Sequence, residues 1–98
     1  MDTLIPGREF VLEHKAREVI DAALIEHPQM DDVLSGLEWR VLHEPGAGYR
    51  IPRQEPPTFI VRSKQWVKTP SLVLMYQFDD KKITVLAARV LPFDDTDN

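Results

Sequence analysis

The chain has 98 residues, of which 43% are hydrophobic and 29% charged, and its net charge is −4. This length allows one hydrophobic core, and the balance of apolar and charged residues excludes wholesale disorder. The chain contains no cysteine, which excludes disulfides, thiolate zinc ligands and cysteine nucleophiles. No apolar stretch approaches the roughly 20 residues that cross a bilayer, and no signal-peptide pattern is present, so we expect a cytoplasmic protein without membrane contact.

The first part of the chain has helical periodicity. Apolar side chains recur every three or four residues, which places them on one stripe of a helix over 8–27. Phe10 and Val11 lie off that stripe, so a short first strand over 8–13 is the alternative. Pro28 ends the segment because proline cannot continue the hydrogen-bond ladder. The stripe consists of Leu12, Ala16, Val19, Ile20, Ala23 and Leu24.

A second helix is predicted over 29–43. Asp31 and Asp32 fall in its first turn, where a carboxylate interacts favourably with the helix dipole. Gly36 lowers helix stability by about 1 kcal/mol relative to alanine, so we expect it to permit close packing. The proline and glycine residues of segment 45–48 end the helix. Its apolar face is predicted to contain Met30, Val33 or Leu34, Leu37 and Val41.

The second half of the chain has the composition of a β-sheet. Segments 59–67, 72–78 and 83–91 are rich in apolar, aromatic and β-branched residues. The polar links between them are short enough for hairpins, which predicts an antiparallel meander of three strands. Segment 50–57 contains three prolines and is predicted to be a loop or an irregular edge.

Together these elements predict an α+β fold in one domain over 1–98. Two N-terminal helices would pack on one face of a small antiparallel sheet of three to four strands, because neither layer can bury its apolar face alone. The other face of the sheet would stay open, and we expect function to be located there. Residues 94–98 are predicted to form a disordered acidic tail.

Basic residues are concentrated in the second half of this acidic chain. Arg62 and Lys64 are two apart in a predicted strand, so both point to one face. There they could grip a phosphate or stabilise a phosphorane, and solvated side chains on an exposed face are the alternative. Arg89 lies among apolar residues and requires a carboxylate partner such as Asp79 or Glu38, or else an open sheet face.

Aromatic and metal-ligating residues give weaker signals. The ring of Tyr76 is expected in the core with its hydroxyl at the edge. Trp39 and Trp66 could stack on bases, but burial is the commoner state of tryptophan in a small domain. The three histidines lack zinc-site spacing and the paired aspartates lack calcium-loop spacing, so no metal and no cofactor is expected.

Two stretches of the chain match a known family in their pattern of apolar residues and turns. Residues 37–49 have the form of a helix followed by a proline and glycine turn. Residues 72–80 form an apolar strand that contains Tyr76 and ends in an acidic turn, and 83–91 form a closing strand with an Arg-Val-Leu segment. With the order of elements over roughly 10–93, the chain resembles the RelE/ParE superfamily of type II toxin-antitoxin toxins.

The resemblance implies a cytoplasmic bacterial toxin that a cognate antitoxin protein neutralises. Its target would be translation, through metal-independent endoribonuclease cleavage of mRNA at the ribosome, or DNA gyrase. If cleavage occurs, Arg62, Lys64 and Arg89 are the candidate phosphate contacts. Of these, Arg89 fits the family's pattern, and Tyr76 matches the family's tyrosine.

The chain departs from the family at two places. Val73 stands where the family commonly has an arginine, three residues before the tyrosine, and the Pro-Phe-Asp-Asp sequence of 92–95 replaces a basic stretch. Both changes remove positive charge near a scissile phosphate, which favours action by binding, or a weakened toxin, over efficient cleavage. One alternative is a non-toxic interaction module that has lost catalytic residues and that forms a homodimer or binds another partner. Another is a simple nucleic-acid platform, whose affinity would fall with salt.

Overall fold

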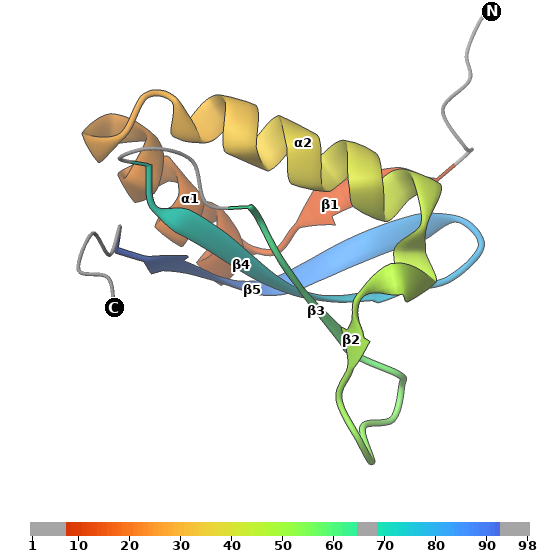
Figure 1. Ribbon diagram of the computed structural model, residues 1–98. Coiled ribbons are helices and arrows are strands. Elements are labelled where there is room, and N and C mark those ends of the chain that lie inside the picture. The colour runs from red at the N-terminus through yellow and green to blue at the C-terminus, as the bar shows by residue number, and fades with distance from the viewer. Residues whose placement is uncertain (1–7, 65–68, 93–98) are drawn as a thin grey trace, which may run out of the picture.

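The computed structural model describes residues 8–64 and 69–92 of the chain (Figure 1). The described residues form two helices, a short 3-10 helix and a five-stranded sheet, which confirms the predicted α+β fold with a larger sheet. No helix in this part of the chain is long and apolar enough to cross a membrane. The elements are β1 (Glu9–Leu12), α1 (His14–Glu26), α2 (Met30–His43), η1 (Pro45–Ala47), β2 (Tyr49–Arg50), β3 (Phe59–Arg62), β4 (Ser71–Phe78) and β5 (Lys82–Leu91).

The strands lie in the order β1-β5-β4-β3-β2. β3, β4 and β5 are antiparallel neighbours, so the predicted meander is confirmed. β1 adds a parallel edge strand beside β5, and β2 adds a two-residue antiparallel edge beside β3. The strand predicted over 59–67 ends at Arg62, and positions 65–67 lie outside the described residues.

The start of the first predicted helix is wrong, and the alternative of a strand is confirmed. Segment 9–12 is β1, and α1 begins only at His14. The backbone N–H of Glu9 donates to the Lys81 carbonyl at 2.9 Å, and that of Glu13 donates to the Val85 carbonyl at 3.0 Å. Pairing with β5 satisfies these backbone groups in an extended conformation, and this tertiary contact overrides the helical periodicity.

Both helices cover one face of the sheet (Figure 1). α1 packs on β5 and α2 lies against β4. The buried stripe of α1 and the buried face of α2 agree with the predicted periodicity. Together with the inward side of the central strands they form one core. Its members are Ala16, Ile20, Ala23, Met30, Val33, Leu37, Val41, Leu42, Val61, Leu72, Leu74, Tyr76, Ile83 and Val85.

Gly36 does not have the packing role predicted for it. A Cβ atom at this position would have no heavy atom within 4 Å beyond the neighbouring helix backbone. The glycine is exposed on α2 and lines a cavity between that helix and the residues that follow β3. The absence of its side chain therefore opens space beside the helix rather than allowing a close contact.

Segment 51–58 forms a loop between β2 and β3, as predicted. Figure 1 shows the loop projecting away from the helices. The N–H of Ile51 donates to the carbonyl of Thr58 at 2.8 Å, which closes the base of the loop. Arg53 has a φ of 64°, the left-handed conformation that a turn requires and a side chain disfavours.

Candidate functional site

The face of the sheet opposite to the helices has no covering element in the described part of the chain (Figure 1). We call it the open face. Directly paired residues of adjacent strands project to the same side of a sheet, so the register defines which side chains share this face. Its side chains are mainly half-buried, whereas those on the helix side are mainly buried.

Two arginines lie in one cross-strand row on the open face. Arg62 of β3 pairs with Val73 of β4, and Val73 pairs with Arg89 of β5. The backbones of the two arginines are therefore two strand spacings apart, about 10 Å. Both side chains are exposed, and neither makes an ion pair or hydrogen bond within the described residues. We call Arg62, Val73 and Arg89 together the basic row.

Arg89 reaches the open face because of an irregularity in β5. Tyr76 pairs with Val85 and Met75 with Ala87, so Leu86 is an extra residue that has no partner in β4. Such a bulge reverses the alternation of side chains beyond it. Val85 therefore points into the core, whereas Ala87 and Arg89 point outward. Ala88 and Val90, which follow the same reversed alternation, pack against the core.

The predicted carboxylate partners of Arg89 do not pair with it. The Asp79 carboxylate accepts the backbone N–H groups of Lys81 at 2.8 Å and of Lys82 at 2.9 Å. These two hydrogen bonds hold the pKa of Asp79 below its usual value, and the one from Lys81 has the larger effect. Glu38 lies on α2, on the helix side of the sheet. The other predicted location of Arg89, an open sheet face, is the observed one.

An apolar row lies beside the basic row. Tyr49 pairs with Ile60, Ile60 with Met75, and Met75 with Ala87, across β2 to β5. Each strand rises about 3.3 Å per residue, so a two-residue step separates the two rows by about 7 Å. The Tyr49 side chain is 65% exposed. Tyr49 could not be found from the sequence, because a two-residue strand has no detectable alternation and its neighbours depend on register.

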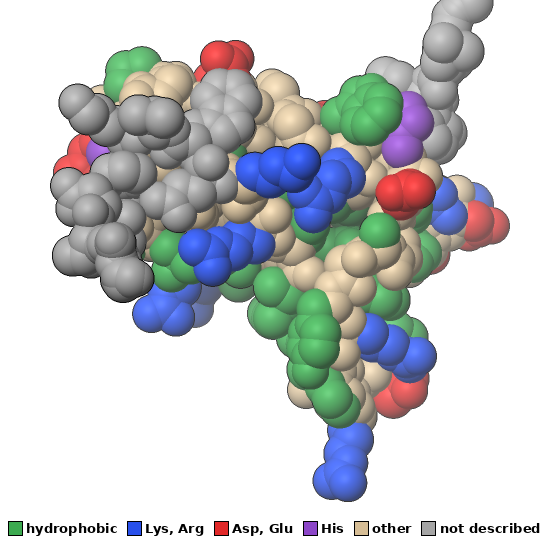
Figure 2. Space-filling view, viewed as in Figure 1, with side chains coloured by type: hydrophobic (Ala, Val, Ile, Leu, Met, Phe, Trp, Pro, Cys, Tyr) green, Lys and Arg blue, Asp and Glu red, His purple; other side chains and the backbone are tan. Residues whose placement is uncertain are grey.

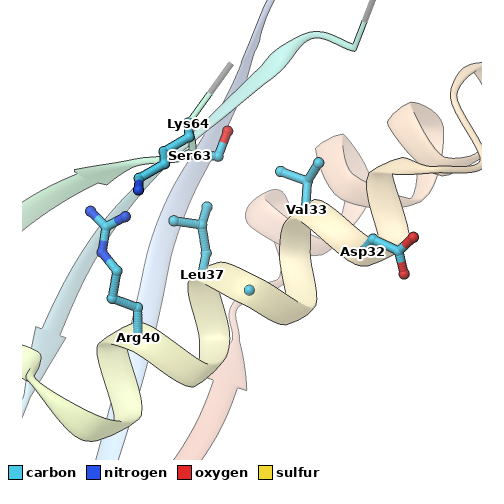
Figure 3. A pocket seen from close by; sticks show the side chains of 7 residues that line it. Asp32, Val33, Leu37, Arg40, Ser63 and Lys64 are labelled. Carbon is cyan, nitrogen blue, oxygen red and sulfur yellow. The ribbon is translucent and has the colours of Figure 1, made fainter. Parts of the chain in front are cut away.

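Lys64 is separated from Arg62, contrary to the prediction that both share one face. β3 ends at Arg62, and Lys64 lies beyond that end. It lines a cavity together with residues of α2 and points toward Arg40 (Figure 3). Arg40 had no distinguishing pattern in the sequence, because it is one charged residue on the exposed side of an amphipathic helix.

Tyr76 has a structural position. Its ring is buried, as predicted, and its hydroxyl donates to the Pro45 carbonyl at 2.6 Å. Burial raises the pKa of Tyr76, against the smaller opposing effects of a Gly48 N–H hydrogen bond and the charge of Arg40. A Cβ at Gly48 would lie 2.7 Å from the Tyr76 Oη and 2.9 Å from the Ile60 carbonyl oxygen. The Tyr76 hydroxyl thus links β4 to η1 by a hydrogen bond, and position 48 beside it has room only for glycine.

Trp39 is exposed, so the prediction of burial is wrong for this residue, and Trp66 lies outside the described residues. The Trp39 indole is 62% exposed and stacks on the His43 ring, with 4.0 Å between ring centroids. This local stack on α2 replaces burial in the core. Among the described residues, no group of three or more His, Cys, Asp or Glu side chains could hold a metal ion.

The open face carries groups that can bind a ligand. Figure 2 shows Lys and Arg side chains below α2 and at several other places on the visible surface. Among the paired positions of β3, β4 and β5, Arg62 and Arg89 are the outward side chains that carry a charge. An arginine stays protonated at physiological pH. Fixed cations beside an apolar surface and an exposed aromatic ring can hold phosphate groups and stack bases.

In comparisons with known proteins, no family model, no curated protein and no solved structure matches the chain. The fold and the site therefore define its class: an α+β protein with one helix-covered and one open sheet face.

Proposed function

We propose that the protein is a toxin-like component of a bacterial type II toxin-antitoxin pair. It is neutralised by a small antitoxin and acts on translation by binding RNA through the open face. The basic row carries this proposal. Val73 stands where toxins of the RelE/ParE superfamily commonly have an arginine, and the register puts Arg62 and Arg89 on either side of it. Two neighbouring strands thus supply positive charge around Val73.

The apolar row supports a single-stranded RNA ligand. Proteins bind single strands with cations that follow the phosphates and with aromatic side chains on which bases stack. Arg62 and Arg89 provide the cations, and the exposed ring of Tyr49 lies on the same face, in the neighbouring row. A duplex would gain little from Tyr49, because its bases are already stacked.

Binding rather than efficient cleavage is the action we propose. Cleavage of RNA without metal requires a group that removes a proton from the attacking hydroxyl. The titratable side chains in the paired open-face positions of β3 to β5 are arginines, which do not act as bases at neutral pH. The protein would then arrest translation by occupying an RNA site. A protein that also cleaved the bound RNA would be a metal-independent endoribonuclease.

The test is induced expression in a bacterial host, with incorporation of labelled amino acid and labelled thymidine followed in parallel. We expect growth arrest in which protein synthesis fails first, and relief of arrest in the double variant Arg62→Gln, Arg89→Gln. Arg17→Gln removes an exposed cation from α1 and is the matched control. Earlier loss of thymidine incorporation would indicate gyrase as the target. Undiminished arrest by the double variant at equal soluble level would refute the role of the basic row.

A non-toxic interaction module is the second candidate, and the exposed apolar side chains favour it. Tyr49 extends an apolar row across four strands, and Trp39 is exposed on α2. Exposed apolar patches of this kind mark protein interfaces. If the protein is such a module, we expect no growth arrest. We also expect a homodimer or heterologous complex that Tyr49→Ser weakens in sedimentation experiments. Growth arrest that Tyr49→Ser leaves unchanged would contradict it.

A further inference from the structure

A groove of about 190 Å³ lies between α2 and the residues that follow β3. One wall is the exposed side of α2, and the other is the chain just beyond Arg62. Figure 3 shows the side chains that surround it. The residues that line it are Asp32, Val33, Gly36, Leu37, Arg40, Ser63 and Lys64.

Two cations from opposite walls converge at one end of the groove. Arg40 of α2 and Lys64 point toward one another (Figure 3). Neither makes an ion pair or hydrogen bond within the described residues. Like charges that face one another repel, and an anion placed between them converts this repulsion into two attractive contacts.

The acidic residue of the groove does not neutralise this pair. Asp32 lies eight residues before Arg40 on α2, which corresponds to about 12 Å along the helix axis. Its carboxylate points away from the cations (Figure 3). The end of the groove at Arg40 and Lys64 therefore carries unbalanced positive charge, although the chain as a whole is acidic.

The middle of the groove is apolar and has free space. Val33 and Leu37 contribute its surface, and a Cβ at Gly36 would find no heavy atom within 4 Å outside the local helix backbone. A dry cavity of about 150 Å³ holds a benzene molecule. The groove can therefore take one ring or one short branched apolar group, and it is too small for the drug-sized ligands of larger pockets.

We propose that this groove binds a small apolar carboxylic acid. The carboxylate lies between Arg40 and Lys64, and the apolar part lies over Val33, Gly36 and Leu37. The guanidinium of Arg40 can hold two carboxylate oxygens at once, whereas Lys64 adds a point charge from the other wall. This site is separate from the basic row and does not depend on whether the protein binds RNA.

The test uses the full chain labelled with ¹⁵N and two probes of the same shape, benzoate and uncharged benzamide, titrated at constant pH. We expect amide shifts at Gly36, Leu37 and Ser63, and affinity for benzoate about tenfold higher than for benzamide because of the charge-assisted contacts. Arg40→Gln and Lys64→Gln should each weaken benzoate severalfold and leave benzamide unchanged. Arg17→Gln, on α1, should change neither affinity.

Gly36→Leu places a side chain in the free space and should weaken both probes, provided that circular dichroism shows a folded protein. Equal affinity for benzoate and benzamide would overturn the proposal, as would benzoate binding that Arg40→Gln and Lys64→Gln both leave intact. A short peptide with a C-terminal phenylalanine that binds over a hundredfold more tightly than benzoate would also overturn the assignment to a small acid. Failure here would leave the growth assay on Arg62 and Arg89 unaffected, so the two proposals are tested separately.

Discussion

Arg62 and Arg89 flank Val73 in a single row across β3, β4 and β5, on the side of the sheet away from the helices. The row has a cation at each end and an apolar side chain in the middle. Its centre, Val73, is the position at which the resemblance to the RelE/ParE superfamily would place an arginine.

A cation at the centre of the row should strengthen binding to single-stranded RNA. Val73→Arg adds a third positive charge on the half-buried open face without disturbing the core. Each added phosphate contact on a single strand steepens the dependence of log K on log salt by about 0.7. Fluorescence anisotropy with an oligouridine RNA at several salt concentrations measures this slope. An unchanged slope would mean that RNA does not contact this row, and Arg17→Gln provides the reference for a remote change of charge.

Removing the hydroxyl of Tyr76 should destabilise the fold. Tyr76→Phe leaves the Pro45 carbonyl without its 2.6 Å donor at a part-buried position, and an unsatisfied group of this kind costs about 1–3 kcal/mol. The free energy of unfolding in urea is the measurement. Tyr49→Phe is the matched control, because that side chain is exposed. Equal unfolding midpoints for the two variants would contradict a structural role for the Tyr76 hydroxyl.

Gly48 should be intolerant of a side chain. Gly48→Ala places a Cβ 2.7 Å from the Tyr76 Oη and 2.9 Å from a backbone carbonyl oxygen, so one of them must move. Overpacking of this kind costs about 1–3 kcal/mol. Tyr76→Phe removes one of the two clashing atoms. In urea unfolding, the double variant should therefore lose less free energy of unfolding than the sum of the losses in the two single variants. Strict additivity would show that the contact between the two residues is not the cause.

Alanine should be favourable at Gly36, in contrast to Gly48. The new methyl group meets no neighbouring atom within 4 Å, and alanine is better than glycine in a helix by about 1 kcal/mol. For a domain of this size we expect the melting temperature to rise by about 4–8 °C. Thermal unfolding followed by circular dichroism checks this. A lower melting temperature for Gly36→Ala would mean that α2 packs more tightly there than the cavity indicates.

The turn between β4 and β5 should contribute a pH-dependent part of the stability. Backbone N–H groups of Lys81 and Lys82 hold the pKa of Asp79 below its usual value. The contribution is therefore present above the unfolded-state pKa, about 3.9 for aspartate, and is lost as the pH falls through the lower folded-state pKa. The melting temperature of Asp79→Asn should lie below that of the unaltered chain at pH 7, and the two should converge in acid.

Asp80→Asn is the control for this prediction, because it removes the same charge from the same turn and leaves the Asp79 carboxylate, which accepts those two hydrogen bonds, unchanged. If Asp79→Asn and Asp80→Asn lower the melting temperature equally at pH 7, overall charge rather than the turn geometry is responsible.

The helices and the meander were predictable because their signals are local. The three-and-four spacing of Ala16, Ile20 and Ala23 defines the buried stripe of α1, and Pro28 limits that helix. Likewise, the apolar strands and their short polar links predict neighbouring antiparallel strands. The strand β1 was only an alternative, because its stability comes from pairing with β5, more than 70 residues later in the chain.

The sequence by itself determined the layers of this protein, since each helix or strand shows its own hydrophobic period. The tertiary structure decided which charged residues meet. Counting from the buried Ile83 and Val85 would direct Arg89 into the core, but the extra residue Leu86 reverses the alternation and turns Arg89 to the open face beside Val73. Likewise, β3 ends at Arg62, so Lys64 does not continue the strand beside Arg62 and instead points toward Arg40. Register and strand ends depend on the partner strand, and a linear pattern does not contain that information.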